Sequence, residues 1–398
     1  MAGWLEQTTG FLVLAVVLLD VFLDVLYARL GTGILAPRIS RMVWRLFLRA
    51  TRPMGKQRRV AMSFCGPVIV AVLVATWALG LTLGTALVIH PALGTAVRAS
   101  SGSTPTDFLT AMYVGGSSVS IVGGSNFSPH TGSFKLFFLF TSLVGVSVVS
   151  LTLTYLMQIY SALQRRNALG LRVYLFSAQR EDAAELIARL GPQGQFQSGY
   201  ANLSELSGSV AEMKETHHFY PVLFYFRFPQ TYYSVSSISS VSLDAVSLIL
   251  SALDPREYGW LQASGAVAEL WAASRLAITS LSATFVSGDA AHPAPPSAET
   301  QERWHRRYRV ALQRLQQAGI RTVANEEEGS RHYVALRAEW DGVVEQLATA
   351  LAYTREETDP AGTHPEQKAK GPPPTTELAR EPFPEGPRER GDAPGPLH

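Results

Sequence analysis

Residues 104–135 hold the residue types and the spacing that could carry chemistry in this chain. The stretch combines a helix-start pattern, a run of small residues with two Gly-Gly pairs, and a return through Ser128-Pro129-His130-Thr131-Gly132. Two long apolar runs, 64–90 and 136–160, flank it. Irregular backbone at membrane depth is tolerated only where protein buries it or where it lines a water-filled path. We therefore interpret the stretch as a re-entrant pore loop.

The loop is predicted to begin with a short helix. Thr104 is expected to be its N-cap, Pro105 its first residue and Asp107 the acidic partner three residues on. The helix should run to about Ser117, entering the membrane from outside. Its C-terminal end then points toward the bilayer centre, where roughly half a negative charge from the aligned peptide dipoles favours a cation.

This order of elements resembles the pore module of the two-transmembrane, potassium-channel-type family. The resemblance covers about residues 60–165. In that family the selectivity filter reads TVGYG, usually followed by Asp, and its carbonyls replace the hydration shell of the ion. A proline commonly follows four residues after the second glycine, and Pro129 is the proline that fits this position.

Counting back from Pro129 places five residues on the filter and Asn126 on the acidic position; the five are Ile121, Val122, Gly123, Gly124 and Ser125. Two of them match the family pattern. The threonine, the aromatic and the second glycine are replaced by isoleucine, glycine and serine. A serine in the left-handed conformation of that second glycine costs roughly 1–2 kcal/mol. Registers anchored on the glycines, 119–123 or 120–124, match no better.

The resemblance implies membrane placement, a homotetramer around a central pore and a cytoplasmic extension. The expected substrate is a monovalent cation, with potassium as the leading candidate. The altered filter predicts weakened selectivity for potassium. A second hypothesis is a non-conducting membrane protein that keeps the channel scaffold, while its cytoplasmic domain binds a partner or senses the membrane. A third interpretation makes residues 104–135 an ordinary external loop.

Three membrane-spanning helices are expected to carry the loop. The run 11–30 is about as long as a bilayer core requires. Because the chain start has no basic n-region and no small-residue cleavage site follows, we interpret residues 1–35 as a retained helix. The pore module is assigned to residues 64–165, with the loop between the second and third helices. Gly145 lies in the third, either as a gating hinge or as a close-packing position.

Asp20 and Asp24 form an acidic pair inside the first membrane helix, four residues apart and so on one face. Acidic groups at this depth are costly unless they face the bundle or a wet cavity. They could pair with arginines near the inner interface or hold the first helix against its neighbours. They could also lie on a proton or ion path. We favour the structural role.

The linker 36–63 is predicted to be a basic amphipathic helix at the membrane surface. Its basic residues, uninterrupted by acidic ones, are Arg38, Arg41, Arg45, Arg49, Arg52, Lys56, Arg58 and Arg59. Anionic lipid is the expected partner, and a short loop between two membrane helices makes nucleic acid improbable. The positive-inside rule places this linker in the cytoplasm and the N-terminus outside. We therefore expect a multi-pass protein of the plasma membrane.

The rest of the chain is expected to form a cytoplasmic helical domain, which makes the fold all-α. Residues 166–288 show helical periodicity, residues 289–354 follow a Pro-rich linker with further helices, and residues 355–398 are predicted to be a disordered tail. Of the 398 residues, 47% are hydrophobic and 17% charged, and the net charge of +2 indicates no nucleic-acid partner. The single cysteine excludes Cys-cluster metal sites. We predict no metal, no cofactor and no enzymatic activity, and His217-His218 lacks neighbours at ligand spacing.

Overall fold

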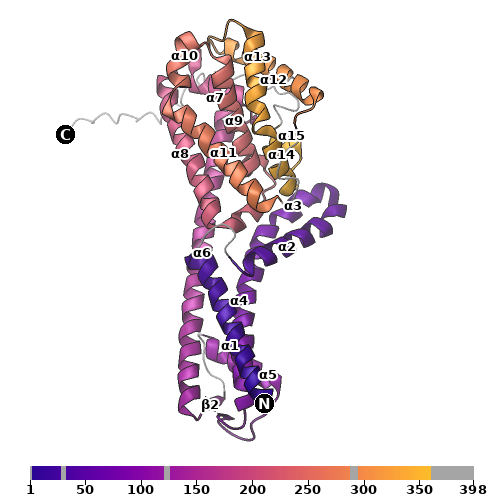
Figure 1. Cartoon of the computed structure of the whole chain (residues 1–398), viewed down its shortest axis with the longest axis vertical. Coiled ribbons are helices and arrows are strands. Elements are labelled where there is room, and N and C mark those ends of the chain that lie inside the picture. The colour runs from indigo at the N-terminus through magenta and orange to yellow at the C-terminus, as the bar shows by residue number, and fades with distance from the viewer. Residues whose placement is uncertain (1, 28–32, 121–125, 287–294, 360–398) are drawn as a thin grey trace, which may run out of the picture.

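The computed structural model describes residues 2–27, 33–120, 126–286 and 295–359, and these are almost entirely helical (Figure 1). The longer helices are α1 (Ala2–Val21), α2 (Ala36–Ala50), α4 (Cys65–Ile89), α5 (Phe108–Val119), α6 (Gly132–Phe176), α8 (Gln197–Phe219), α9 (Val235–Ala252), α11 (Gly265–Phe285), α12 (Ala298–Gln317) and α13 (Glu326–Ala338). The shorter ones are η1 (Phe22–Leu26), η2 (Arg52–Gln57), α3 (Arg58–Ser63), η3 (His90–Ala92), α7 (Ala183–Leu190), η4 (Pro192–Gly194), η5 (Pro221–Tyr225), η6 (Thr231–Tyr233), α10 (Pro255–Gln262), α14 (Asp341–Ala350) and α15 (Arg355–Thr358). Two three-residue strands, β1 (Val97–Ala99) and β2 (Phe127–Pro129), pair antiparallel.

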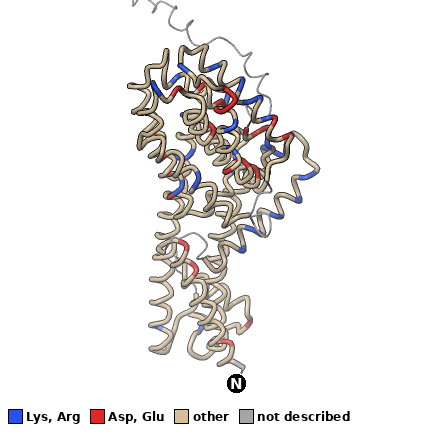
Figure 2. The backbone as a smooth tube through the Cα atoms, turned by 45° about the horizontal axis from the view of Figure 1, so that its top comes forward, with Lys and Arg blue, Asp and Glu red and all other residues tan. Residues whose placement is uncertain are grey.

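The molecule is elongated, with the apolar helices α1, α4 and α6 at one end and a helical bundle at the other (Figure 1). In the described part of the chain, four segments are long and apolar enough to cross a membrane: Gly3–Leu26, Arg58–Ala92, Gly132–Phe176 and Val235–Ala252. The first three are 28%, 39% and 22% buried, whereas the fourth, α9, is 94% buried inside the bundle. Charged residues are sparse along the three apolar helices and frequent in the bundle (Figure 2). This is the architecture of an all-α membrane protein.

Glycines let α1 and α4 pack closely. A Cβ atom at Gly10 would lie 2.7 Å from the carbonyl oxygen of Gly84, and one at Gly80 would lie 2.6 Å from the side chain of Val17. Gly80 and Gly84 are four residues apart on α4, the small-residue spacing that allows membrane helices to approach. At the end far from the bundle, called the distal end below, the carboxylate of Glu6 lies 2.6 Å from His90 Nδ1.

Helix α6 is one continuous helix of 45 residues, about 68 Å long at 1.5 Å per residue. It runs from the distal end into the bundle, through the predicted domain boundary at residue 165 (Figure 1). Its Arg166 is buried and donates to the carbonyls of Leu223 and Phe226 at 3.0 and 2.9 Å. The guanidinium group of Arg166 therefore stabilises the contact between α6 and the bundle.

Helix α9 forms the centre of the bundle, with nearly every residue buried. Helices α6, α7, α11, α13 and α14 all contact it. The helical periodicity predicted for residues 166–288 corresponds to α7, α8, α9, α10 and α11 together with the end of α6. Ser207 Oγ of α8 donates to Glu269 of α11 at 2.8 Å.

A buried ion-pair network joins α9, α12, α13 and α14 with the cap residues Asp182 of α7 and Asp359 of α15. Arg307 of α12 contacts Asp182 and Asp244 at 2.7 and 3.0 Å. Arg337 of α13 contacts Asp244 and Asp341, each at 3.0 Å, and also Asp359. Burial alone would raise the pKa of Asp182, but the charge and hydrogen bonds of Arg307 outweigh it and hold that pKa below its ordinary value. The network fixes the helices that cover α9.

The start of the predicted disordered tail is ordered instead. Residues 355–358 form α15, with a capping box between Thr354 and Glu357. Glu357 pairs with Arg59 of α3 at 2.7 Å, and Arg355 pairs with Asp341 at 2.5 Å. These partners are distant in sequence, so local composition could not reveal the docking. Residues 360–398 lie outside the described residues.

His217 is buried next to the base of α6. Its Nδ1 lies 2.8 Å from the carbonyl oxygen of Met213, and its Nε2 is buried without a hydrogen-bond partner in the structure. Burial, together with the positive charge of Arg166, lowers the pKa of His217 to about 3. The folded protein therefore holds this ring neutral. Among the described residues, no group of three His, Cys, Asp or Glu side chains could hold a metal ion.

Replacing Arg337 tests the ion-pair network. Arg337→Leu should destabilise the protein by about 3–5 kcal/mol, because it leaves buried carboxylates without a counter-charge. The matched control is Arg309→Gln in the exposed pair with Glu302, whose side chains are both 62% exposed; it should cost about 1 kcal/mol at most. Melting of the detergent-solubilised protein measures both. Equal shifts for the two variants would contradict the role given to the network.

The neutral state of His217 predicts a pH dependence. The unfolded chain binds a proton at this ring below its ordinary pKa of 6.5, whereas the folded chain does so only near pH 3. Stability should therefore fall as the pH drops below 6.5, by about 2 kcal/mol from this group between pH 7 and pH 5. In His217→Gln the melting temperature should depend less on pH than in the wild type. If this variant and the exposed-site control His332→Gln follow the wild-type curve alike, His217 is not the cause.

Candidate functional site

The short helix of the predicted pore loop is α5, and it begins later than the sequence suggests. Its N-cap is Asp107, whose carboxylate accepts hydrogen bonds from the Thr110 backbone N–H at 2.9 Å and from the Thr110 hydroxyl at 2.7 Å. The prediction of Thr104 as the N-cap was wrong. The hydroxyl of Thr104 accepts instead from the backbone N–H of Ala99, at 3.0 Å, and Pro105 precedes the helix. Both residues suit an N-cap, so the sequence alone could not choose.

Helix α5 starts at the distal end of the apolar helices and runs inward between α4 and α6. At its start, the Phe108 ring packs edge-on against His90 at the end of α4, with centroids 5.5 Å apart. At its end, a Cβ atom on Gly145 of α6 would lie 1.9 Å from the carbonyl oxygen of Val119. Gly145 is thirteen residues from the first residue of α6, which is about 20 Å along the helix. The C-terminal carbonyls of α5 therefore lie well inside the apolar part of the molecule.

The first Gly-Gly pair brings α5 against the backbone of α4. A Cβ atom on Gly115 would lie 2.9 Å from the backbone nitrogen of Ala86, and one on Gly116 would lie 3.3 Å from the side chain of Thr82. Both glycines lie within the helix, inside the extent to about Ser117 that the sequence predicts. Their function is close packing between the two helices.

The chain returns to the distal end by residue 127. Phe127 of β2 pairs with Ala99 of β1, and the backbone N–H of Ser100 donates to the carbonyl of Asn126 at 2.7 Å. Asn126 is exposed. The five predicted filter positions, Ile121, Val122, Gly123, Gly124 and Ser125, lie outside the described residues. Helix α5 therefore starts at the distal end, and β2 lies at that same end.

Gly145 is a packing position in this structure. Helix α6 continues through it without interruption, and the contact with Val119 leaves no room for a side chain. A hinge at this glycine has no support from the backbone, whereas the close approach explains why only glycine fits. Of the two roles that the sequence left open, the structure shows the packing role.

Helix α6 has a polar face that the sequence analysis missed. Its buried residues recur at alternating spacings of three and four, including Thr141, Gly145, Val148, Thr152, Tyr155 and Ile159. A second row with the same spacing is polar and not buried: Ser147, Ser150, Thr154, Gln158, Ser161 and Arg165. On a helix such a row lies on one face, separate from the packed one. The signal was present in the sequence as a helical period of polar residues within an apolar run.

The two aspartates of the acidic pair in α1 and η1 differ in their hydrogen bonds. Asp20 is held by three donors, whereas one oxygen of Asp24 has no partner in the structure. Asp20 is fully buried and accepts hydrogen bonds from Trp77 Nε1 at 2.9 Å and from the backbone N–H groups of Ile34 and Leu35 at 2.8 and 2.6 Å. It therefore joins α1, α4 and the start of α2. Asp24 is half-buried, and its Oδ2 is buried without a hydrogen-bond partner in the structure. In the described residues neither aspartate forms an ion pair with an arginine.

The comparisons with known proteins give one relative. No protein-family model matches the chain, and no solved structure matches it significantly. The chain is similar to YdjJ of Bacillus subtilis (strain 168), which is described as an uncharacterized membrane protein. The two are 20% identical over 250 residues, covering 63% of this chain and 70% of the relative. Together with the long apolar helices, this likeness indicates a membrane protein.

A comparison of the two aspartates tests the structural role of Asp20. Asp20→Ala leaves the Trp77 N–H and two backbone N–H groups without their acceptor, at about 1–3 kcal/mol for each donor that stays buried. The yield of folded protein and its melting temperature should fall clearly. The matched control Asp24→Ala, four residues away, should cost much less. An Asp20 variant with unchanged melting but altered ion flux would instead place this residue on an ion path.

Proposed function

We propose that the chain is a potassium-channel-type pore protein that conducts monovalent cations with weakened selectivity. The observation that carries the proposal is the path of α5, which enters between α4 and α6, ends about 20 Å along α6 and is followed by a return to the same end. A cation at the end of α5 would face the last carbonyls of the helix and the negative end of its dipole. The filter stays assigned to residues 121–125, followed by Asn126.

The polar face of α6 supports a water-filled path. Hydroxyl and amide side chains on the surface of a membrane helix are expected to face a wet cavity or another helix rather than lipid. The neighbouring exposed face of α6 is apolar, with Val146, Val149, Leu153 and Met157. Lipid suits this apolar face. In a homotetramer, four copies of the polar face would line the central pore below the filter.

The proposed topology has three membrane-spanning helices, α1, α4 and α6. Helix α9 passes the test of length and hydropathy, but protein covers nearly all of its surface, so it needs no lipid. The arginines of α2 and α3 lie at the bundle end of the apolar helices, opposite the distal end (Figure 2). By the positive-inside rule the bundle is cytoplasmic, and the N-terminus and the α4–α5 connection are outside. We infer a multi-pass protein of the plasma membrane.

Ion flux into liposomes tests the proposal, and Gly145 supplies the matched variants. The wild type should carry both potassium and sodium, with potassium favoured. Gly145→Ala should lose most of this flux, because the new Cβ atom displaces the end of α5. Gly132→Ala, in the same helix, should keep it, since nothing lies within 4 Å of a Cβ atom at Gly132. Size-exclusion chromatography and melting confirm that each variant is folded.

Two outcomes would contradict the proposal. Absence of flux from folded, oligomeric wild type would reject conduction and favour a channel-like scaffold whose cytoplasmic bundle binds a partner or senses the membrane. Equal flux from both glycine variants would show that the end of α5 takes no part in the path.

A further inference from the structure

Helix α2 is held at the level where the apolar helices meet the bundle. Asp20 of α1 binds the backbone at its N-terminus, and the chain leads from its C-terminus through η2 and α3 to the start of α4. Val43 and Trp44 bury one side of the helix, with the Trp44 ring 5.6 Å from that of Tyr225. The helix is therefore fixed next to the ends of two apolar helices, where the headgroups of a bilayer crossed by those helices would lie.

Four arginines form an exposed row along α2. Arg38, Arg41, Arg45 and Arg49 recur every three or four residues and so share one face. In the described part of the chain no carboxylate pairs with any of them; Arg38 and Arg41 donate to the carbonyls of Ile34 and Pro37 in their own segment. This contrasts with the bundle, where Arg307 and Arg337 each pair with buried aspartates. Four unpaired guanidinium groups in a row form a strongly positive surface.

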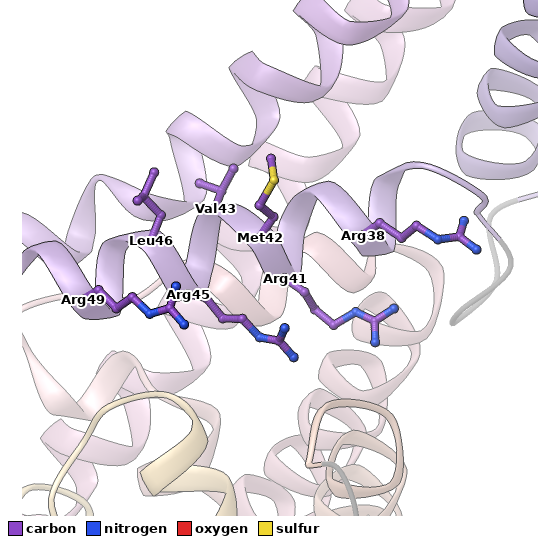
Figure 3. Close-up of a pocket in the computed structure, with 7 residues that line it drawn as sticks. All are labelled: Arg38, Arg41, Met42, Val43, Arg45, Leu46 and Arg49. Carbon is purple, nitrogen blue, oxygen red and sulfur yellow. The ribbon is translucent and has the colours of Figure 1, made fainter.

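Apolar side chains accompany this row. Met42 and Leu46 are each 63% exposed, on the same stretch of helix. Together with Val43 and the four arginines they line an open groove of about 560 Å³ (Figure 3). Figure 3 shows the guanidinium groups on one side of α2 and the tips of Met42, Val43 and Leu46 on the other. A soluble anion would use the arginines alone, whereas a lipid would use both sides.

We propose that this face of α2 binds the phosphate headgroups of anionic lipids, with Met42 and Leu46 in contact with the acyl chains. Basic residues near a bilayer surface each contribute about fivefold to the binding of anionic membranes. Guanidinium groups match phosphate oxygens with paired hydrogen bonds. The position beside the apolar helices favours lipid over nucleic acid or a soluble anion. The proposal rests on α2 alone and stands whether or not the chain conducts ions.

The test titrates the full-length protein, in a non-ionic detergent, with short-chain phosphatidylglycerol and follows its melting temperature. Binding to the folded state raises that temperature. Phosphatidylcholine should give little shift. Arg41→Gln/Arg45→Gln should need roughly thirtyfold more phosphatidylglycerol for the same shift. The control Arg306→Gln/Arg331→Gln removes the same charge from exposed sites in the bundle and should follow the wild type.

A further double variant distinguishes the binding of lipid from the binding of free anions. Met42→Ser/Leu46→Ser should weaken the response to phosphatidylglycerol and leave that to inorganic phosphate unchanged. The proposal is overturned if the α2 arginine variant responds like the wild type or if the control variant loses the response equally. It is also overturned if inorganic phosphate or a single-stranded oligonucleotide matches phosphatidylglycerol at equal concentration. A response to phosphatidylcholine as large as that to phosphatidylglycerol would likewise reject it.

Discussion

The structure depends on the close approach of α5 to its two neighbours. A helix that ends inside the apolar part of a membrane protein exposes carbonyl groups that lipid cannot satisfy, so protein or water must surround them. Gly115 of α5 lets the backbone of α4 lie close on one side, and Gly145 of α6 lets Val119 of α5 lie close on the other. These two contacts hold α5 between α4 and α6. With them, its C-terminal end is held at a defined depth, where a cation would be stabilised.

The apolar helices and the bundle are joined by specific polar contacts on two sides. The continuous helix α6 belongs to both, and Arg166 fixes its base to the backbone carbonyls around η5. On the other side, Asp20 ties α1 to α4 and α2, and the pair between Arg59 and Glu357 docks α3 on α15. A movement of the bundle would therefore reach α6 and the α2–α3 segment together. The proposed lipid surface on α2 lies on one of these two connections.

The sequence revealed what is periodic or continuous and missed what depends on distant partners. Sequence analysis identified the apolar runs because they are local. It also identified the order of the pore-loop segments, which is a helix, then small residues, then a return through Gly and Pro. The hydrogen bond from the end of β1 at Ala99 to Thr104 could not be seen in the helix-start pattern. The partner of Asp20 proved to be Trp77, 57 residues away, and Asp359 docks through Arg337, 22 residues away. The polar face of α6 was present in the sequence, but it is meaningful only once the packed face is known. The filter register remains a prediction.

The most direct test of a central pore is the water accessibility of neighbouring positions on α6. Thr154→Cys lies on the polar face and Leu153→Cys on the apolar one, and both side chains are exposed in the single chain. The native cysteine, Cys65, is buried. A membrane-impermeant thiol reagent applied to the protein in liposomes should modify Thr154→Cys and leave Leu153→Cys unmodified. Equal protection of both positions from the reagent would contradict a water-filled path along α6.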